Sequence, residues 1–221
     1  MRWLLVGSKQ SDCIRDAQKW LFEKYIGTIP DFFIRSDTNI QNWCKDVLEY
    51  LETVRERNIV FGLDDMLITG KLHNNLLLDA LSILQSTEIE RFELAYAHRS
   101  FNKGKFIYNE LEEYLTYPPD ALYLVSTQFS LWKVEALKRV LKEIDSDPWS
   151  FEVKGTAIAA CFDYPVFNYI EESALSKRWN GINVRGMKQE DIDELIRLGF
   201  LNKNELINEP HRNIKSSGKE V

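Results

Sequence analysis

The pattern of hydrophobic and polar residues in the first third of the chain alternates between short apolar segments and amphipathic stretches. Residues 3–8 and 31–36 have the pattern of strands, while residues 11–27 and 39–57 carry apolar side chains at helical spacing. A third apolar segment, residues 58–61, follows the second helix. Because a β-α-β-α-β order places helices across the faces of a sheet, this pattern predicts a largely parallel sheet.

The rest of the chain continues this mixture of elements. Its patterns predict helices at residues 72–86, 133–144 and 188–199, and strands at residues 91–97, 105–110 and 121–132. Neither an internal repeat nor a clear linker interrupts this order. We therefore predict a single α/β domain over residues 1–209, with a mostly parallel central sheet flanked by helices, followed by a flexible polar tail at residues 210–221.

The apolar run that starts at Asn58 stops abruptly at two adjacent aspartates, Asp64 and Asp65. Ligands of parallel α/β sheets bind beyond the carboxyl ends of the strands, which is where both residues fall. Carboxylates are hard oxygen ligands that suit Mg²⁺ or Mn²⁺, especially beside a diphosphate. The alternative is structural, because Asp65 could simply cap the segment around Thr69 and Gly70.

Composition and charge argue against several classes of protein. Hydrophobic residues make up 44% and charged residues 28% of the chain, as in ordinary globular proteins. The net charge of −6 and the pI near 5.3 give no reason to expect a nucleic-acid partner. The histidines are isolated, which argues against zinc, and the sequence contains no Walker-type loop and no GxGxxG motif. Scattered cysteines and the lack of an apparent signal peptide predict a cytoplasmic location.

A second stretch, residues 126–155, combines two tryptophans with polar and acidic residues. An aromatic face such as that of Trp149 can stack on a pyranose ring, and the nearby Glu152 could accept a proton from an incoming hydroxyl group. We predict that both residues lie in a loop that starts at Pro148. The alternative is that the tryptophans fill the core and that Glu152 is a solvated surface charge.

Taken together, these two stretches resemble a group of small nucleotide-sugar-dependent glycosyltransferases of the GT-A fold, found in bacteria and large viruses. The resemblance covers roughly residues 1–200. It rests on a strand that ends in Asp-Asp, a Ser-x-Gln-x-x-Leu-Trp segment, a Pro-Trp-x-Phe-Glu-x-x-Gly segment and a Lys-x-Trp segment. The matching residues are Asp37, Trp43, Asp64, Asp65, Gln128, Trp132, Pro148, Trp149, Phe151, Glu152, Gly155, Lys177 and Trp179.

On the donor side, the resemblance implies a UDP-, GDP- or TDP-linked sugar bound by Asp37, Asp64 and Asp65. It implies Mn²⁺ or Mg²⁺ as a cofactor, with Asp65 as the metal ligand. The usual GT-A metal motif is Asp-x-Asp, and Met66 stands here at its third position. At most Asp64 and Asp65 remain for a metal, so the open alternatives are binding through one carboxylate, a weak site, or no site.

On the acceptor side, the resemblance implies that Gln128, Trp132 and Trp149 contact the acceptor or the transferred sugar. Glu152 is the expected catalytic base if the enzyme inverts the anomeric configuration, whereas in a retaining enzyme Gln128 would help to position the sugar. The acceptor would be a glycan or a lipid-linked molecule, as in polysaccharide biosynthesis, and a lipid-linked one would allow peripheral membrane association.

Two other functions remain open from the sequence. One is a binding or scaffold module with the same fold and no turnover. The other is a nucleotidyltransferase, which would also use carboxylates and a metal. Such an enzyme is expected to carry a glycine- and lysine-rich loop near its N-terminus, and the segment at residues 6–12 offers only Gly7 and Lys9.

Overall fold

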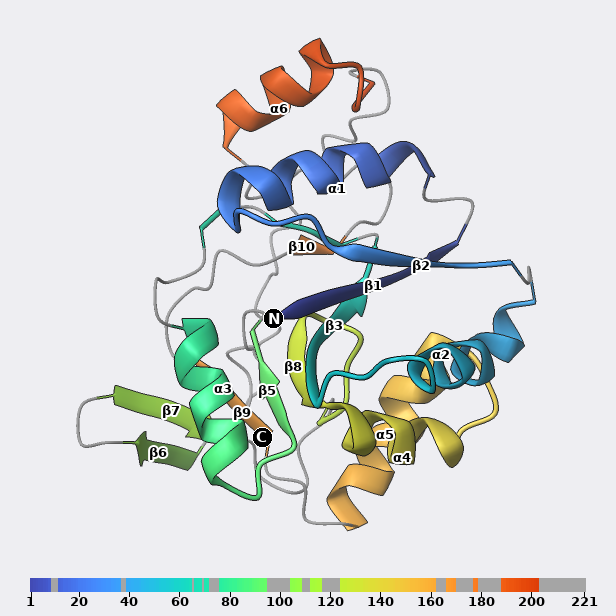
Figure 1. Cartoon of the computed structure of the whole chain (residues 1–221), viewed down its shortest axis with the longest axis vertical. Helices are drawn as coiled ribbons and strands as arrows, with labels where there is room; N and C mark the ends of the chain where they lie inside the picture. Colours follow the sequence, from blue (N-terminus) through green and yellow to red (C-terminus); the bar gives the residue numbers. More distant parts are fainter. Residues whose placement is uncertain are drawn as a thin grey trace, which may run out of the picture.

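The computed structural model describes residues 1–8, 12–36, 39–64, 66–68, 70–71, 76–94, 104–108, 112–116, 124–161, 166–169, 177–178 and 188–202. Figure 1 shows the order of the elements. They are β1 (Arg2–Ser8), α1 (Asp12–Tyr25), β2 (Asp31–Arg35), the 3₁₀ helix η2 (Ile40–Asn42), α2 (Trp43–Leu51), β3 (Asn58–Leu63), β4 (Met66–Leu67), α3 (Leu76–Ser86), β5 (Arg91–Glu93), β6 (Gly104–Tyr108), β7 (Glu112–Thr116), β8 (Ser130–Lys133), α4 (Val134–Lys142), α5 (Pro148–Cys161), β9 (Val166–Tyr169), β10 (Lys177–Arg178) and α6 (Gln189–Arg197).

The described strands form one large sheet in the order β2-β1-β3-β8-β5-β9-β7-β6, while β4 and β10 pair separately. The pairs β1–β2, β1–β3 and β5–β9 are parallel. Since β8 runs antiparallel to both β3 and β5, and β7 runs antiparallel to both β9 and β6, six of these eight strands point in one direction. The prediction of a single α/β domain with a mostly parallel sheet flanked by helices is confirmed.

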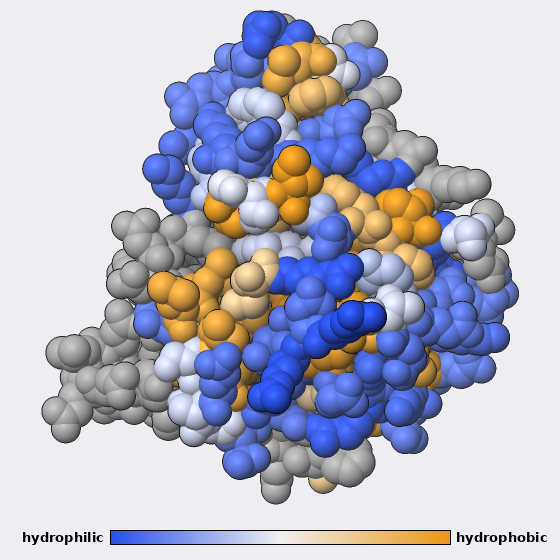
Figure 2. Space-filling model, in the orientation of Figure 1, coloured by the Kyte–Doolittle hydropathy of each residue, from blue (hydrophilic) through white to orange (hydrophobic). Residues whose placement is uncertain are grey.

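Helices cover both faces of this sheet and enclose two apolar clusters (Figure 1). One face packs against α1 and α3, with α6 lying against α1, and the other face packs against α2, α4 and α5. Alternate side chains of β1 serve the two clusters, with Leu5 in the first and Leu4 in the second, as the pleat of a strand requires. On the face shown in Figure 2, hydrophobic residues form separate patches among hydrophilic ones. Among the described helices, none has the length and apolar character needed to cross a membrane.

Three of the predicted elements differ from the structure. The helix predicted to end at residue 57 ends at Leu51, and Val54 then reaches the core from a turn. Within the described part of the strand predicted over residues 121–132, residues 124–132, the structure is regular only from Ser130. The preceding Ser126 and Thr127 are held instead by side chains, with Ser126 accepting a hydrogen bond from Arg91 and Thr127 donating one to Glu152 of α5. The segment predicted as a loop from Pro148 is the start of helix α5.

Helix α5 has no obvious amphipathic pattern, which explains why the sequence did not reveal it. Its buried residues are Phe151, Gly155 and Ala159, at a spacing of four, so small residues form part of the buried face. Trp149 and Val153, which are apolar, lie exposed instead, with 58% and 67% of their surface accessible. Apolar residues therefore occur on both sides of the helix, and helical periodicity is lost.

Candidate functional site

The carboxyl ends of β1, β3 and β5 lie at the same edge of the sheet. Strand β8 runs the other way and begins at Ser130, which pairs with Phe61 near the end of β3 and with Glu93 at the end of β5. The loop of residues 124–129, which precedes β8, therefore lies at this edge as well. We call this region the carboxyl edge, and it is where the two stretches singled out from the sequence meet.

Asp64 follows β3 at the carboxyl edge and is buried, with 2% of its surface exposed. Its backbone N–H donates to the carbonyl oxygen of Val6, 3.0 Å away, which extends the pairing between β1 and β3. Its Oδ2 accepts a hydrogen bond from the guanidinium of Arg15 at 3.3 Å, and the same Arg15 nitrogen donates to the carbonyl oxygen of Ser8 at 2.8 Å. Arg15 thus neutralises a carboxylate that would otherwise be costly to bury.

Helix α1 also holds the chain on the other side of residue 65. Gln18 is fully buried, and its side-chain amide donates to the carbonyl oxygen of Met66. Arg15 and Gln18 are one helical turn apart, so one face of α1 fixes both neighbours of Asp65. Asp65 itself lies outside the described residues, as does Asp37. The prediction that Asp37, Asp64 and Asp65 line one cleft therefore stays a prediction.

The donor set for a divalent cation can be tested on Asp64. Its carboxylate is paired with Arg15 and buried, and among the described residues no group of three or more His, Cys, Asp or Glu side chains is placed to hold a metal ion. The described residues therefore do not by themselves fit a Mn²⁺ or Mg²⁺ site. Asp65 remains the predicted metal ligand.

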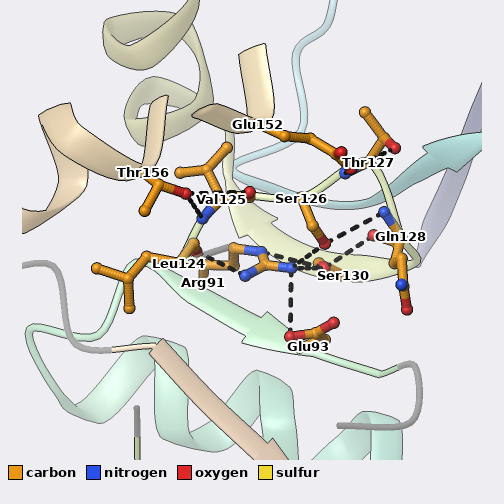
Figure 3. A network of polar contacts seen from close by, with 10 residues as sticks. All are labelled: Arg91, Glu93, Leu124, Val125, Ser126, Thr127, Gln128, Ser130, Glu152 and Thr156. Atoms are coloured by element: carbon orange, nitrogen blue, oxygen red, sulfur yellow. Dashed lines mark hydrogen bonds and ion pairs between the residues drawn. The ribbon is translucent and has the colours of Figure 1, made fainter. Parts of the chain in front are cut away.

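The segment of residues 124–130, which is this loop together with the first residue of β8, is organised by a buried arginine (Figure 3). Arg91 begins β5 and exposes 1% of its surface. Its guanidinium donates to the carbonyl oxygen of Leu124 at 2.7 Å, to Ser126 Oγ at 2.9 Å and to Ser130 Oγ at 2.8 Å. Glu93 Oε2 lies 3.6 Å from the same guanidinium and balances its charge. This segment of irregular backbone is therefore held by side chains rather than by a strand ladder.

Glu152 lies in the second turn of α5 and contacts the same loop from the other side. Its Oε1 accepts two hydrogen bonds from Thr127, one from the backbone N–H and one from Oγ, both at 2.8 Å. Asp147 caps this helix, because its Oδ1 accepts from the Ser150 N–H at 2.7 Å. The hydrogen bond from Ser150 is the largest cause that lowers the pKa of the Asp147 carboxyl group below its usual value.

The residues predicted to contact a sugar occupy different environments. Gln128 is partly buried at the carboxyl edge, between Thr127 and the start of β8. Trp149 is exposed at the start of α5, where its ring is accessible to a ligand. Trp132 exposes 2% of its surface and packs in the core on the α2–α4–α5 face, so in this structure it presents no ring face to a ligand. Instead, the guanidinium group of Arg91 lies over the Trp132 ring, with its Cζ atom 5.4 Å from the ring centroid.

Several residues of this region were not predicted from the sequence, namely Arg15, Arg91, Ser126 and Thr127. Arg91 and Glu93 did offer a signal, since opposite charges at positions i and i+2 of a short strand point to the same side of a sheet. Arg15 offered none, because only the pairing of β1 with β3 brings it to Asp64.

An open hollow of about 390 Å³ lies at the opposite edge of the sheet, where β1, β2 and β3 begin. It is lined by residues that include Arg2, Asp31 and Asn58, and none of the predicted site residues that the structure describes borders it. Arg2 already pairs there with Asp31 and Glu56. We place the candidate site at the carboxyl edge because Asp64, Gln128 and Glu152, which the sequence singled out, lie there.

Comparisons with known proteins found distant similarities only. No family model and no curated protein matches the chain. Similar solved structures include 4-diphosphocytidyl-2C-methyl-D-erythritol synthase from Anaerococcus prevotii, with 14% identity and a TM-score of 0.40 over 90% of this chain and 78% of that one. S. aureus TarS 1-349 has 14% identity and a TM-score of 0.39, over 90% and 64% of the chains. A197 from STIV has 12% identity and a TM-score of 0.40, over 79% and 83%.

Proposed function

We propose that this protein is a glycosyltransferase that moves a sugar from a nucleotide-diphosphate donor to a hydroxyl group of a glycan or lipid-linked acceptor. One observation carries the proposal. The two stretches that resemble GT-A glycosyltransferases, which are far apart in the sequence, meet at the carboxyl edge, with Asp64 on one side and the Thr127–Glu152 pair on the other. Ligands of α/β sheets bind at such an edge.

In this proposal the donor lies over the ends of β1 and β3. Asp37 and Asp65 contact the nucleotide diphosphate. Asp64 has a structural role, because it holds Arg15 and the end of β1 in place. Because Gly7 has no side chain, the Asp64 carboxylate can lie directly against the backbone of β1. Mn²⁺ or Mg²⁺ bound by Asp65 would offset the charge of the diphosphate.

The acceptor enters in this proposal from the side of α5, where Trp149 offers an exposed ring for stacking. In an inverting transfer the acceptor oxygen attacks the anomeric carbon, the bond from that carbon to the diphosphate oxygen breaks, and its electron pair leaves on the diphosphate. The hydroxyl proton passes to Glu152 Oε2, because Oε1 is already bound by Thr127. In a retaining transfer Gln128 positions the sugar and no such base is needed.

Thermal unfolding with a panel of ligands tests this proposal. The panel contains UDP-glucose, GDP-mannose and TDP-glucose, each with and without Mn²⁺, and CTP as the probe for a nucleotidyltransferase. A ligand that binds the native state raises the melting temperature, by an amount that grows with the logarithm of the ratio of its concentration to its dissociation constant. We expect at least one nucleotide sugar to stabilise the protein and CTP to have a smaller effect.

The other outcomes are informative. Stabilisation by CTP alone would replace the proposal with a nucleotidyltransferase, and no stabilisation by any nucleotide sugar would leave a scaffold module. Asp65→Ala addresses the metal: the variant should keep its fold and lose the part of the stabilisation that depends on Mn²⁺. Unchanged Mn²⁺ dependence in Asp65→Ala would remove the metal assignment without affecting the assignment of the donor.

A further inference from the structure

The backbone of Gln128 is held on both sides by serine hydroxyl groups. Its N–H donates to Ser126 Oγ at 3.3 Å, and its carbonyl oxygen accepts a hydrogen bond from Ser130 Oγ at 2.9 Å (Figure 3). Both peptide groups of this one residue are therefore fixed, although it lies in neither a helix nor a strand. Such local side-chain to backbone bonds hold a turn in one conformation.

Both hydroxyl groups are themselves held by Arg91. One guanidinium nitrogen donates to Ser126 Oγ at 2.9 Å and to Ser130 Oγ at 2.8 Å, and Nε reaches Ser130 Oγ at 3.1 Å. Arg91, Ser126 and Ser130 therefore form a connected set of side chains around the backbone of Gln128, which we call the Arg91 cradle.

The cradle is buried and its polar groups are satisfied. Ser126 and Ser130 expose 3% and 0% of their surface, and Arg91 exposes 1%. Glu93, also buried, faces the guanidinium, and the carbonyl oxygen of Leu124 takes a further hydrogen bond. A buried polar network with all members paired fixes one arrangement and resists movement. Gln128 is thus presented by a rigid support.

The side chain of Gln128 is not part of the cradle. In Figure 3 its carboxamide points away from Arg91, and within the described part of the chain no hydrogen bond reaches it. A carboxamide offers two N–H donors and a carbonyl acceptor, so it can both donate a hydrogen bond to a hydroxyl group and accept one from it. A residue that contacts a ligand needs a fixed backbone and a side chain that the surrounding described residues do not bind, and Gln128 has both.

We propose that Gln128 binds a hydroxyl group of the transferred sugar and that Arg91 is its positioning residue, acting through Ser126 and Ser130. This inference rests on the proposed function for the identity of the ligand, whereas the positioning role of the Arg91 cradle does not. Gln128 then determines specificity for the sugar, and the nucleotide is recognised elsewhere along the carboxyl edge.

The first experiment tests the cradle without any ligand, by amide hydrogen exchange of the segment 124–130. Ser126→Ala removes one link between Arg91 and Gln128 and leaves the guanidinium in place, and Arg91→Lys removes several links. Both variants should exchange faster in this segment than the wild type does, with little change elsewhere. Thr87→Val is the control, because its hydroxyl group also makes two backbone hydrogen bonds, but from a position between α3 and β5 and not in residues 124–130.

The second experiment measures the affinity for a nucleotide sugar and for the matching nucleoside diphosphate. The probe is the member of the UDP-glucose, GDP-mannose and TDP-glucose panel that binds the wild type best. Ser126→Ala should weaken binding of the nucleotide sugar by about tenfold and leave binding of the diphosphate within about twofold, as expected for one lost hydrogen bond. In a Gln128→Leu background, Ser126→Ala should have no further effect, because it acts through Gln128.

The outcomes separate the parts of the proposal. Unchanged exchange at residues 124–130 in both variants would overturn the positioning role. Faster exchange combined with equal loss of both ligands, or with additive effects of Ser126→Ala and Gln128→Leu, would overturn the contact between Gln128 and the sugar. A wild-type protein that binds no member of the panel would overturn the proposed function and this contact together, while the exchange result would still decide on the cradle.

Discussion

The carboxylate of Asp64 occupies the space above Gly7 where a side chain of residue 7 would project. A Cβ atom on Gly7 would lie 1.7 Å from Asp64 Oδ2 and 2.1 Å from its Cγ. Asp64 cannot easily move away, because its N–H is bonded to Val6 and its Oδ2 to Arg15. Position 7 at the end of β1 therefore requires glycine, because a larger residue would displace the Asp64 carboxylate. The buried ion pair between Asp64 and Arg15 depends on this glycine.

Gly7→Ala should destabilise the protein by about 1–3 kcal/mol, the usual range for an added methyl group in a packed interior. Chemical denaturation of four proteins tests the cause: wild type, Gly7→Ala, Asp64→Ala and the double variant. If the Asp64 carboxylate is the obstacle, Gly7→Ala should cost less in the Asp64→Ala background. If Gly7→Ala destabilises the protein equally in both backgrounds, an atom other than those of the Asp64 carboxylate must obstruct the added methyl group.

The Asp147 cap at the start of α5 should make the stability of the protein depend on pH. Asp147 Oδ1 accepts from the Ser150 N–H, and this bond is the first cause of the lowered pKa of Asp147. A carboxyl group with a lowered folded-state pKa stabilises the protein above its unfolded-state pKa of about 3.8, and this contribution is lost as the pH falls through the lower folded-state value.

Asp147→Ala should therefore cost about 1 kcal/mol at pH 7, the typical value of an N-cap. The difference from the wild type should shrink as the pH falls below the ordinary aspartate range. Asp147→Asn is the control, because an asparagine oxygen can still cap the helix, so it should be closer to the wild type at pH 7. Urea denaturation between about pH 7 and pH 3 measures both effects. A constant difference across that range would contradict a role for the ionised carboxylate.

The sequence was sufficient to predict the first three strands of the sheet and the place of Asp64, because those follow from local patterns, whereas β7 and β9 were not predicted. After Asn58, strand β3 (Asn58–Leu63) contains no polar side chain, and its end could be located to within a few residues. The partner of Asp64 could not be predicted in the same way. Arg15 is 49 residues away and reaches Asp64 only because β1 pairs with β3 in one register.

The loop before β8 shows the opposite case, in which the local pattern is misleading. Its apolar and β-branched residues predicted a strand from residue 121, yet Thr127 donates both its N–H and its hydroxyl group to Glu152, 25 residues later. Arg91 binds Ser126 from 35 residues earlier. Where such long-range hydrogen bonds replace the strand ladder, residue propensity cannot reveal the conformation.

Helix α6 is attached to α1 by a buried carboxylate, which leads to a further prediction at alkaline pH. Asp191 is fully buried and accepts hydrogen bonds from Tyr25 Oη and Lys24 Nζ. Burial, followed by the hydrogen bond to Asp191, raises the pKa of Tyr25 well above its ordinary value. A raised folded-state pKa gives a contribution that is complete below about pH 10 and is lost as the pH rises beyond it.

Tyr25→Phe should cost about 1 kcal/mol near pH 8, as expected for one hydrogen bond. Above about pH 10 the wild type should lose stability as the Tyr25 hydroxyl group ionises. Tyr25→Phe lacks this hydroxyl group, so its free energy of unfolding should fall less steeply with pH. Denaturation at a series of pH values up to about 11 tests this. A variant with the same alkaline slope as the wild type would show that Tyr25 does not link α6 to α1 in this way.

The last prediction separates two roles of Glu152, as a catalytic base and as the residue that holds Thr127. The two roles use different properties of the side chain. Holding Thr127 requires only an oxygen at the position of Oε1, which accepts both hydrogen bonds. Accepting a proton from the acceptor hydroxyl requires a carboxylate. Glu152→Gln keeps the first property and removes the second, whereas Glu152→Ala removes both.

If Glu152 is the base, Glu152→Gln should lose transfer activity by about 100-fold or more, a common size for the loss of acid–base catalysis, and keep donor affinity within about twofold. Glu152→Ala should lose transfer and also weaken the donor, because the segment of residues 124–130 is no longer tied to α5. Thr127→Val provides the matched control for that second effect: it should weaken the donor moderately while leaving the carboxylate in place. Release of nucleoside diphosphate and direct binding of the donor measure the two quantities separately. Full transfer activity in Glu152→Gln, together with weakened donor binding in Glu152→Ala, would leave Glu152 as a positioning residue and would remove the candidate base for an inverting mechanism.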